Sequence, residues 1–179
     1  YKIGYGIAWN GKLWVAVGSG SINTIATSPD GINWTGRDKT IFSSYGNGIA
    51  WNGSIWVAVG FDFTNTIATS PDGINWTGRG NNILDYYGID IAWNGSLWVA
   101  VGLGSSNTIA TSPDGIIWTG RGKSIFDSEV KGISWNGNLW VAVGGTSNTI
   151  ATSPDGINWT GRGNSILNIY GYGIAWNGS

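Results

Sequence analysis

The chain of 179 residues contains no cysteine, no histidine and no methionine. Without cysteine it can form neither a disulfide nor a reactive thiolate. Without cysteine and histidine it also lacks the usual protein ligands of zinc, copper and haem. We therefore expect no metal site and no cofactor. The absent initiator methionine suggests a processed chain or a fragment of a longer one.

Charged side chains are also scarce, at 11% of residues with a formal net charge of −1. Proteins that bind nucleic acid or anionic membranes carry basic patches, which this balance does not provide. The sequence has no run of 18 apolar residues, which a membrane-spanning helix would need. We expect neither nucleic-acid binding nor membrane insertion.

Glycine and tryptophan are abundant, with 31 and 13 residues, and tryptophan recurs at three positions of a repeated unit. The first series steps by 42, 42, 42 and 41 residues, and the other two keep the same period. The three series are Trp9, Trp51, Trp93, Trp135 and Trp176; Trp14, Trp56, Trp98 and Trp140; and Trp34, Trp76, Trp118 and Trp159. A period near 40 without long helical patterns predicts the four-stranded blades of an all-β propeller.

The turns divide one unit into four short antiparallel strands. Asn10-Gly11 predicts a tight hairpin between strand A, which ends at Trp9, and strand B at 13–17. Strand C covers 24–28, and Pro29-Asp30-Gly31 turns the chain into strand D at 32–35. The units give blades at about 5–46, 47–88, 89–130 and 131–171, and an extra inner strand at 172–179.

Strand B is apolar on both faces, so each blade must be covered by its neighbours. We expect the tryptophans of one blade to meet alanine and glycine positions on the next. Four blades and a surplus inner strand form a closed ring of four or an open stack with two apolar faces in water. We therefore expect self-association, with ring closure by more than one chain, such as an eight-bladed dimer whose extra strands are exchanged or frayed. A longer parent array is the alternative.

The segment Ser28–Trp34 resembles the Asp-box of sialidase-type (BNR) propellers, although one residue between Asp and Gly is missing. The "WVAVG" and "TIATSPDG" segments also resemble non-enzymatic blades of bacterial, photosystem-assembly and giant-virus repeat proteins. The resemblance implies a propeller fold and a structural turn in which each aspartate accepts backbone N–H groups. A calcium or ligand role is the alternative. These aspartates are Asp30, Asp72, Asp114 and Asp155.

Sialidases, as the resemblance implies, need an arginine triad, a Tyr–Glu nucleophile pair and a separate acid. Here the only glutamate is Glu129, in a connecting loop, and each unit has one arginine at an equivalent position: Arg37, Arg79, Arg121 and Arg162. Equivalent positions do not converge on one substrate, so we expect no catalytic residues and no enzyme activity. The arginines form either a ring of anion contacts or pairs with a neighbouring blade.

Two sets of aromatic residues are candidates for binding. The A–B and C–D turns are nearly identical in every unit, whereas the loops on the opposite face vary and carry Phe61, Phe63, Tyr86 and Tyr87. Either that face binds a partner, or its loop sequences vary only because folding does not constrain them. Trp9, Trp51, Trp93 and Trp135 are candidate sugar platforms, whereas the Trp14 and Trp34 series are expected in the core. Tyr5, Asn47, Ile89, Lys131 and Tyr172 are expected to line the central channel.

These observations favour a non-catalytic propeller scaffold for assembly or protein interaction, such as a surface or coat component. The alternative is a multivalent lectin with one shallow site per blade, and a third is the remnant of a glycan hydrolase. An extracellular or virion-surface location fits the first two.

Overall fold

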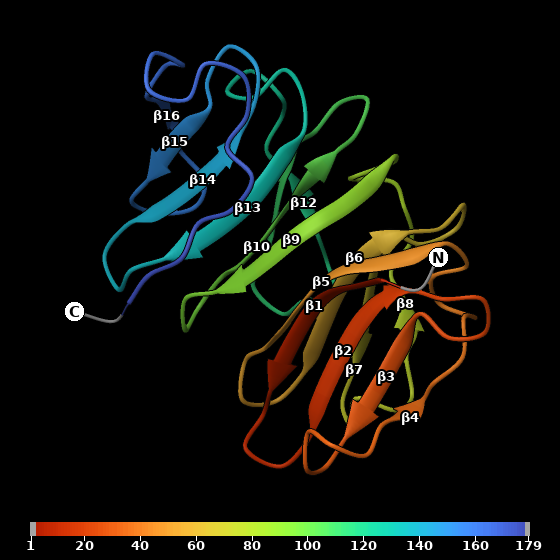
Figure 1. Cartoon of the computed structure of the whole chain (residues 1–179). Coiled ribbons are helices and arrows are strands. Elements are labelled where there is room, and N and C mark those ends of the chain that lie inside the picture. The colour runs from red at the N-terminus through yellow and green to blue at the C-terminus, as the bar shows by residue number, and fades with distance from the viewer. Residues whose placement is uncertain (1–2, 178–179) are drawn as a thin grey trace.

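The computed structural model describes residues 3–177, which form four separate four-stranded antiparallel sheets. Each sheet is one blade, and its strands are adjacent in chain order (Figure 1). No helix long and apolar enough to cross a membrane occurs in this range. The strands are β1 (Ile3–Trp9), β2 (Trp14–Ser19), β3 (Ile25–Ser28) and β4 (Thr35–Gly36) in blade 1; β5 (Tyr45–Trp51), β6 (Trp56–Phe61), β7 (Ile67–Ser70) and β8 (Thr77–Gly78) in blade 2; β9 (Tyr87–Trp93), β10 (Trp98–Leu103), β11 (Ile109–Ser112) and β12 (Thr119–Gly120) in blade 3; and β13 (Val130–Trp135), β14 (Trp140–Gly144), β15 (Ile150–Ser153) and β16 (Thr160–Gly161) in blade 4.

The predicted Asn-Gly hairpins join the first two strands of each blade. Gly11 has a φ of 94°, which favours glycine, and Trp9 pairs directly with Trp14 across the hairpin. The Asn10 Oδ1 accepts hydrogen bonds from the backbone N–H groups of Lys12 and Leu13, at 2.9 and 2.7 Å. The inner strands begin one or two residues before the predicted blade limits.

The outermost strand of each blade is shorter than predicted and begins later. We expected strand D at 32–35, but β4 contains only Thr35 and Gly36. Ile32 and Asn33 do not join the sheet because their N–H groups donate to the Asp30 carboxylate instead. The turn thus takes residues that the apolar pattern alone assigns to a strand.

Neighbouring blades pack face to face, but not with the partners expected from the sequence. In the core between blades 1 and 2, Val15 and Val17 of β2 pack with Ile49, Trp56 and Ala58 of blade 2. The tryptophan and the alanine therefore lie on the same face and meet valines of the preceding blade. The sequence led us to expect alanine and glycine opposite the tryptophan, whereas the fully buried partners are valines and, of the blade 1 alanines, only Ala8 of β1 packs against the edge of this core.

Each crossover between blades contributes one fully buried apolar side chain, which we call the plug. The plugs are Phe42, Leu84 and Phe126, each 0% exposed. A Cβ atom at Gly46 or Gly60 would lie only 3.3 or 3.2 Å from the Phe42 ring. Glycine at these two strand positions therefore makes the space that the plug fills.

The array of blades is open. Figure 1 shows blades 1 and 2 on one side and blades 3 and 4 on the other, with the inner strands towards the centre. Ile7 of β1 is 56% exposed, whereas its equivalents Ile49, Ile91 and Ile133 are 8, 4 and 4% exposed. One face of blade 1 thus has no covering blade among the described residues.

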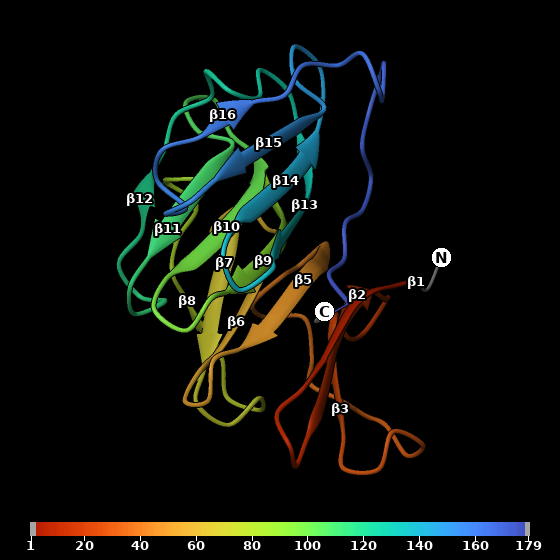
Figure 2. The same ribbon diagram turned by 90° about the vertical axis from the view of Figure 1, so that its left-hand side faces the viewer.

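At the other end, the chain follows blade 4 without forming a strand. We expected an inner strand at 172–179, but 172–177 form no ladder (Figure 2), and 178–179 lie outside the described residues. The Gly171 N–H donates to the Gly144 carbonyl at 2.9 Å. The ladder is absent because the described chain supplies no second strand beside this segment.

Candidate functional site

The inner strands enclose a central channel of about 830 Å³. All five residues that the sequence predicted in the channel line it: Tyr5, Asn47, Ile89, Lys131 and Tyr172. The end of the channel next to the variable loops is called the channel mouth here, and that side of the molecule the loop face.

An aromatic cluster occupies the channel mouth across blades 1 to 3. The ring of Tyr45 lies 6.1 Å from Tyr5 and 5.4 Å from Phe61. Phe61 in turn lies 5.7 Å from Phe63 and 6.5 Å from Tyr87, both in edge-on geometry. These distances are in the favourable range for aromatic pairs. The structure thus brings together three of the four residues predicted on the variable face.

Two of the aromatic residues predicted on the variable loops are strongly exposed, one inside this cluster and one without a ring contact to it. The Phe63 side chain is 81% exposed, and Tyr86, at the end of the crossover before β9, is 50% exposed. An exposed ring such as Phe63 that adjoins further aromatic rings is unusual on an inert loop surface and is typical of interaction sites.

A polar cluster continues the channel mouth between blades 3 and 4. The Tyr87 hydroxyl donates a hydrogen bond to the Glu129 carboxylate, which also pairs with the Lys131 ammonium. Burial and the Glu129 carboxylate both raise the pKa of Tyr87. Burial opposes ionisation of Glu129, but hydrogen bonds from Lys131 and Tyr87 lower its pKa overall. Lys131 also lies 5.9 Å from the centre of the Tyr170 ring.

Sequence reasoning missed this Tyr–Glu contact. It assigned Glu129 to a connecting loop, where the residue does lie, but it did not predict that Glu129, directly before β13, faces the channel. The available signal was positional, because Tyr45, Tyr87 and Glu129 occupy equivalent places in the repeat: the two tyrosines begin their inner strands, and Glu129 directly precedes its own.

A second carboxylate, Asp90, lies deeper between blades 3 and 4. Its Oδ1 accepts the N–H of Ile91 at 2.8 Å, and its Oδ2 accepts the N–H of Ile133 at 3.0 Å. Burial raises the pKa of Asp90 to about 6, although both hydrogen bonds act in the opposite direction. The equivalent residue of the other inner segments is glycine: Gly6, Gly48, Gly132 and Gly173.

The loops around the mouth are fixed by aspartates. Asp62, in the loop after β6, accepts the N–H groups of Ser43 and Thr64 at 3.1 and 2.8 Å. In the next two blades the aspartate lies on the crossover instead, where Asp85 binds Ser105 and Asp127 binds Ser147. Loop and preceding crossover are thus tied together at blades 2, 3 and 4, so the loops beside the aromatic cluster are held in place.

The Asp-box residues lie on the opposite side of the blades, called the turn face. Asp30 accepts the N–H groups of Ile32 and Asn33, both at 2.8 Å, and these bonds lower its pKa. Asp72, Asp114 and Asp155 make the same two backbone contacts in their blades. Within residues 3–177 no group of three or more acidic, histidine or cysteine side chains could hold a metal ion.

Each arginine makes a side-chain hydrogen bond within its own blade rather than with a neighbouring one. The Arg37 Nε donates to the Thr27 hydroxyl of the same blade at 2.8 Å. Arg79, Arg121 and Arg162 make the same contact with the corresponding threonine of β7, β11 and β15. They therefore lie at the outer strands, away from the channel mouth and from one another, and form no anion clamp.

The tryptophans divide differently from the prediction. Trp56, Trp98 and Trp140 are fully buried, as expected of that series, but Trp34 is 41% exposed and its Nε1 donates to the Gly31 carbonyl. Trp76, Trp118 and Trp159 make the same bond to their turns, but they are half-buried and pack against the cores between blades, so this series both braces the turn and covers the core. Of the candidate sugar platforms, Trp9 is 41% exposed and stacks 5.0 Å from Trp14. Trp51, Trp93 and Trp135 are half-buried in the same arrangement.

No family model matches the chain, and no curated protein is similar to it. Among solved structures, a nidogen/laminin complex matches 97% of this chain at a TM-score of 0.71 and 14% identity. The WD40 β-propeller domain of Doa1 matches 98% at a TM-score of 0.64 and 10% identity. The chain spans 68% and 59% of those two chains. The fold is therefore that of a β-propeller, of which this chain supplies an open arc of four blades.

Proposed function

We propose that this chain is a non-catalytic propeller scaffold that binds a protein partner through the channel mouth. The aromatic cluster of Tyr5, Tyr45, Phe61, Phe63 and Tyr87 carries the proposal. Tyrosine and phenylalanine are enriched at the centres of protein interfaces, where rigid rings bury a large area at a small entropic cost. The neighbouring Glu129–Lys131 pair supplies polar contacts at the edge of the same surface.

Two further observations support binding rather than catalysis. The loops that carry the rings are held by aspartate hydrogen bonds, so little ordering is needed when a partner binds. The Tyr87–Glu129 contact resembles half of a sialidase site, but the four arginines lie at separate outer strands, so nothing there would hold the substrate carboxylate.

A peptide library selected on the immobilised chain tests this proposal. Peptides bound by the natural chain should lose roughly tenfold or more in affinity when Tyr5 and Phe63, the two most exposed rings of the cluster, are both changed to serine. Ile117→Ser is the matched control, since Ile117 is 70% exposed on the turn face. Peptides that bind the double variant as tightly as the natural chain, or a library that yields no binders, would contradict the proposal. Turnover of a panel of sialosides would contradict its non-catalytic part.

The exposed indole of Trp9 favours a second candidate, a lectin with one shallow site per blade. Indole faces stack on sugar rings, and repeated weak sites would bind a multivalent glycan by avidity. A glycan array probed with the natural chain and with Trp9→Ala separates the two proposals. Binding that simple sugars compete away and that falls in the variant supports the lectin, whereas a blank array removes it.

A further inference from the structure

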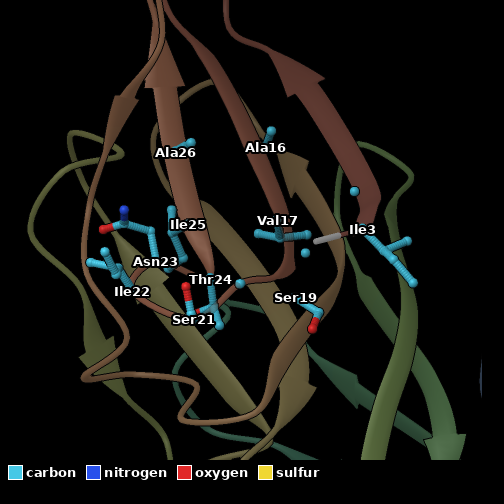
Figure 3. A pocket seen from close by; sticks show the side chains of 13 residues that line it. Ile3, Ala16, Val17, Ser19, Ser21, Ile22, Asn23, Thr24, Ile25 and Ala26 are labelled. Carbon is cyan, nitrogen blue, oxygen red and sulfur yellow. The ribbon is translucent and has the colours of Figure 1, made fainter. Parts of the chain in front are cut away.

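Blade 1 has an empty pocket at the place where each of blades 2 to 4 holds a plug, and we call this pocket the socket. It lies on the uncovered side of the blade, has a volume of about 390 Å³, and is lined by Gly4, Ala16, Gly18, Ile22 and Ala26, among others (Figure 3). Gly4 and Gly18 correspond to Gly46 and Gly60, the pair that accepts the Phe42 plug in blade 2. The pocket is therefore the place of a plug from a preceding crossover, which the described chain does not supply.

The opposite end of the array carries a plug without a complete socket. Leu167 occupies the plug position in the crossover after blade 4, at the same spacing as Phe42, Leu84 and Phe126. It lies 3.2 Å from where a Cβ on Gly171 would be, much as Phe42 lies 3.3 Å from that position on Gly46. Unlike the three interior plugs, Leu167 is 37% exposed, because no second strand closes over it.

The two ends of the array share one seven-residue sequence, which forms part of β1 at the first end and no strand at the other. Residues 4–10 and 171–177 both read GYGIAWN. Segment 171–177 lies against blade 4, in the place that the inner strand of a following blade would take. A Cβ on Gly132 would be 3.5 Å from both the Gly173 Cα and the Ile174 Cγ2. It has no ladder there, whereas β1 pairs with β2 from Ile3 to Trp9 with one irregularity at Tyr5.

We propose that blade 1 of a second copy docks on blade 4, with its β1 displacing 171–177 and Leu167 entering the socket of Gly4 and Gly18. The new junction repeats the three interior ones, because β1 presents the same side chains as the segment it replaces and brings β2 with it. Ile7 becomes buried like Ile49, Ile91 and Ile133. The contact is head-to-tail. Two chains that form it at both ends, with blade 1 of each chain on blade 4 of the other, make a closed ring of eight blades.

Sedimentation velocity on the full chain and two single variants tests this junction. Ile7→Glu places a charge on the blade 1 face, and Leu167→Glu places one on the plug. Each should weaken self-association roughly a hundredfold or more, because an unpaired carboxylate is buried. An equimolar mixture of the two variants should recover heterodimers, since the first retains an intact plug and the second an intact socket.

Ile117→Glu is the matched control, because it adds a carboxylate at an exposed apolar position of an interior blade and should associate like the natural chain. Tryptophan fluorescence checks that each variant is folded, and Ala16→Glu replaces Ile7→Glu if that variant is not. A natural chain that stays monomeric at micromolar concentration overturns the proposal. So do single variants that still associate, or a mixture that remains monomeric.

Removal of 171–179 tests which inner strand is used. The truncated chain should associate at least as tightly as the full one, since the competitor of β1 is gone. Loss of association on truncation would overturn the displacement, because it would mean that 171–177 itself supplies the inner strand of the junction.

Discussion

The Asp90 carboxylate accepts the backbone N–H of Ile133 at 3.0 Å and thereby joins blade 3 to blade 4. The other inner strands have glycine at the Asp90 position and make their junctions without this bond. The contact therefore belongs to one junction of the array, and it places an ionisable group between two packed sheets.

We predict that Asp90 makes stability fall as pH rises from about 4 to 6. Its pKa is about 6 in the folded chain and near 3.8 in the unfolded chain, so the native state holds the proton more tightly in this window. Relative to the natural chain, Asp90→Asn should gain on the order of 2 kcal/mol in unfolding free energy between pH 4 and pH 7. Urea unfolding at several pH values measures this, and a constant difference between the two proteins would contradict it.

We predict that Asp72→Ala destabilises the fold by about 1–2 kcal/mol at pH 7, because the N–H groups of Ile74 and Asn75 lose their acceptor. Hydrogen bonds lower the pKa of Asp72 despite some burial, so its contribution is present above pH 4 and is lost as pH falls further. Denaturant midpoints of variant and natural chain should therefore converge in acid. A calcium-dependent midpoint in the natural chain would instead indicate a metal role.

The repeat, the strand class and the hairpins could be predicted because tryptophan spacing and Asn-Gly pairs act locally. The partners across a blade junction could not. Whether Trp56 meets Ala or Val depends on which face of β6 turns towards blade 1, and both faces are apolar. The contact between Tyr87 and Glu129 joins residues 42 positions apart, and only the radial stack brings equivalent positions of successive blades side by side.

We predict that Phe126→Ala destabilises the chain by about 3–5 kcal/mol, because loss of this fully buried ring leaves a cavity between Gly144 of blade 4 and the packed face of blade 3. Leu167→Ala is the matched comparison at the exposed end, and for a single chain it should cost about 1 kcal/mol or less. Thermal unfolding in dilute solution compares them. Similar losses for both would mean that the plugs do not stabilise through burial between blades.

All four blades have the same WVAVG strand and the same Asp-box turn. The packing surfaces of one blade are therefore much like those of any other blade in the array. A unit gained or lost by recombination would find neighbours that already fit it on either side. The number of units can therefore change during evolution without new interface residues, and the number of blades in the ring changes with it.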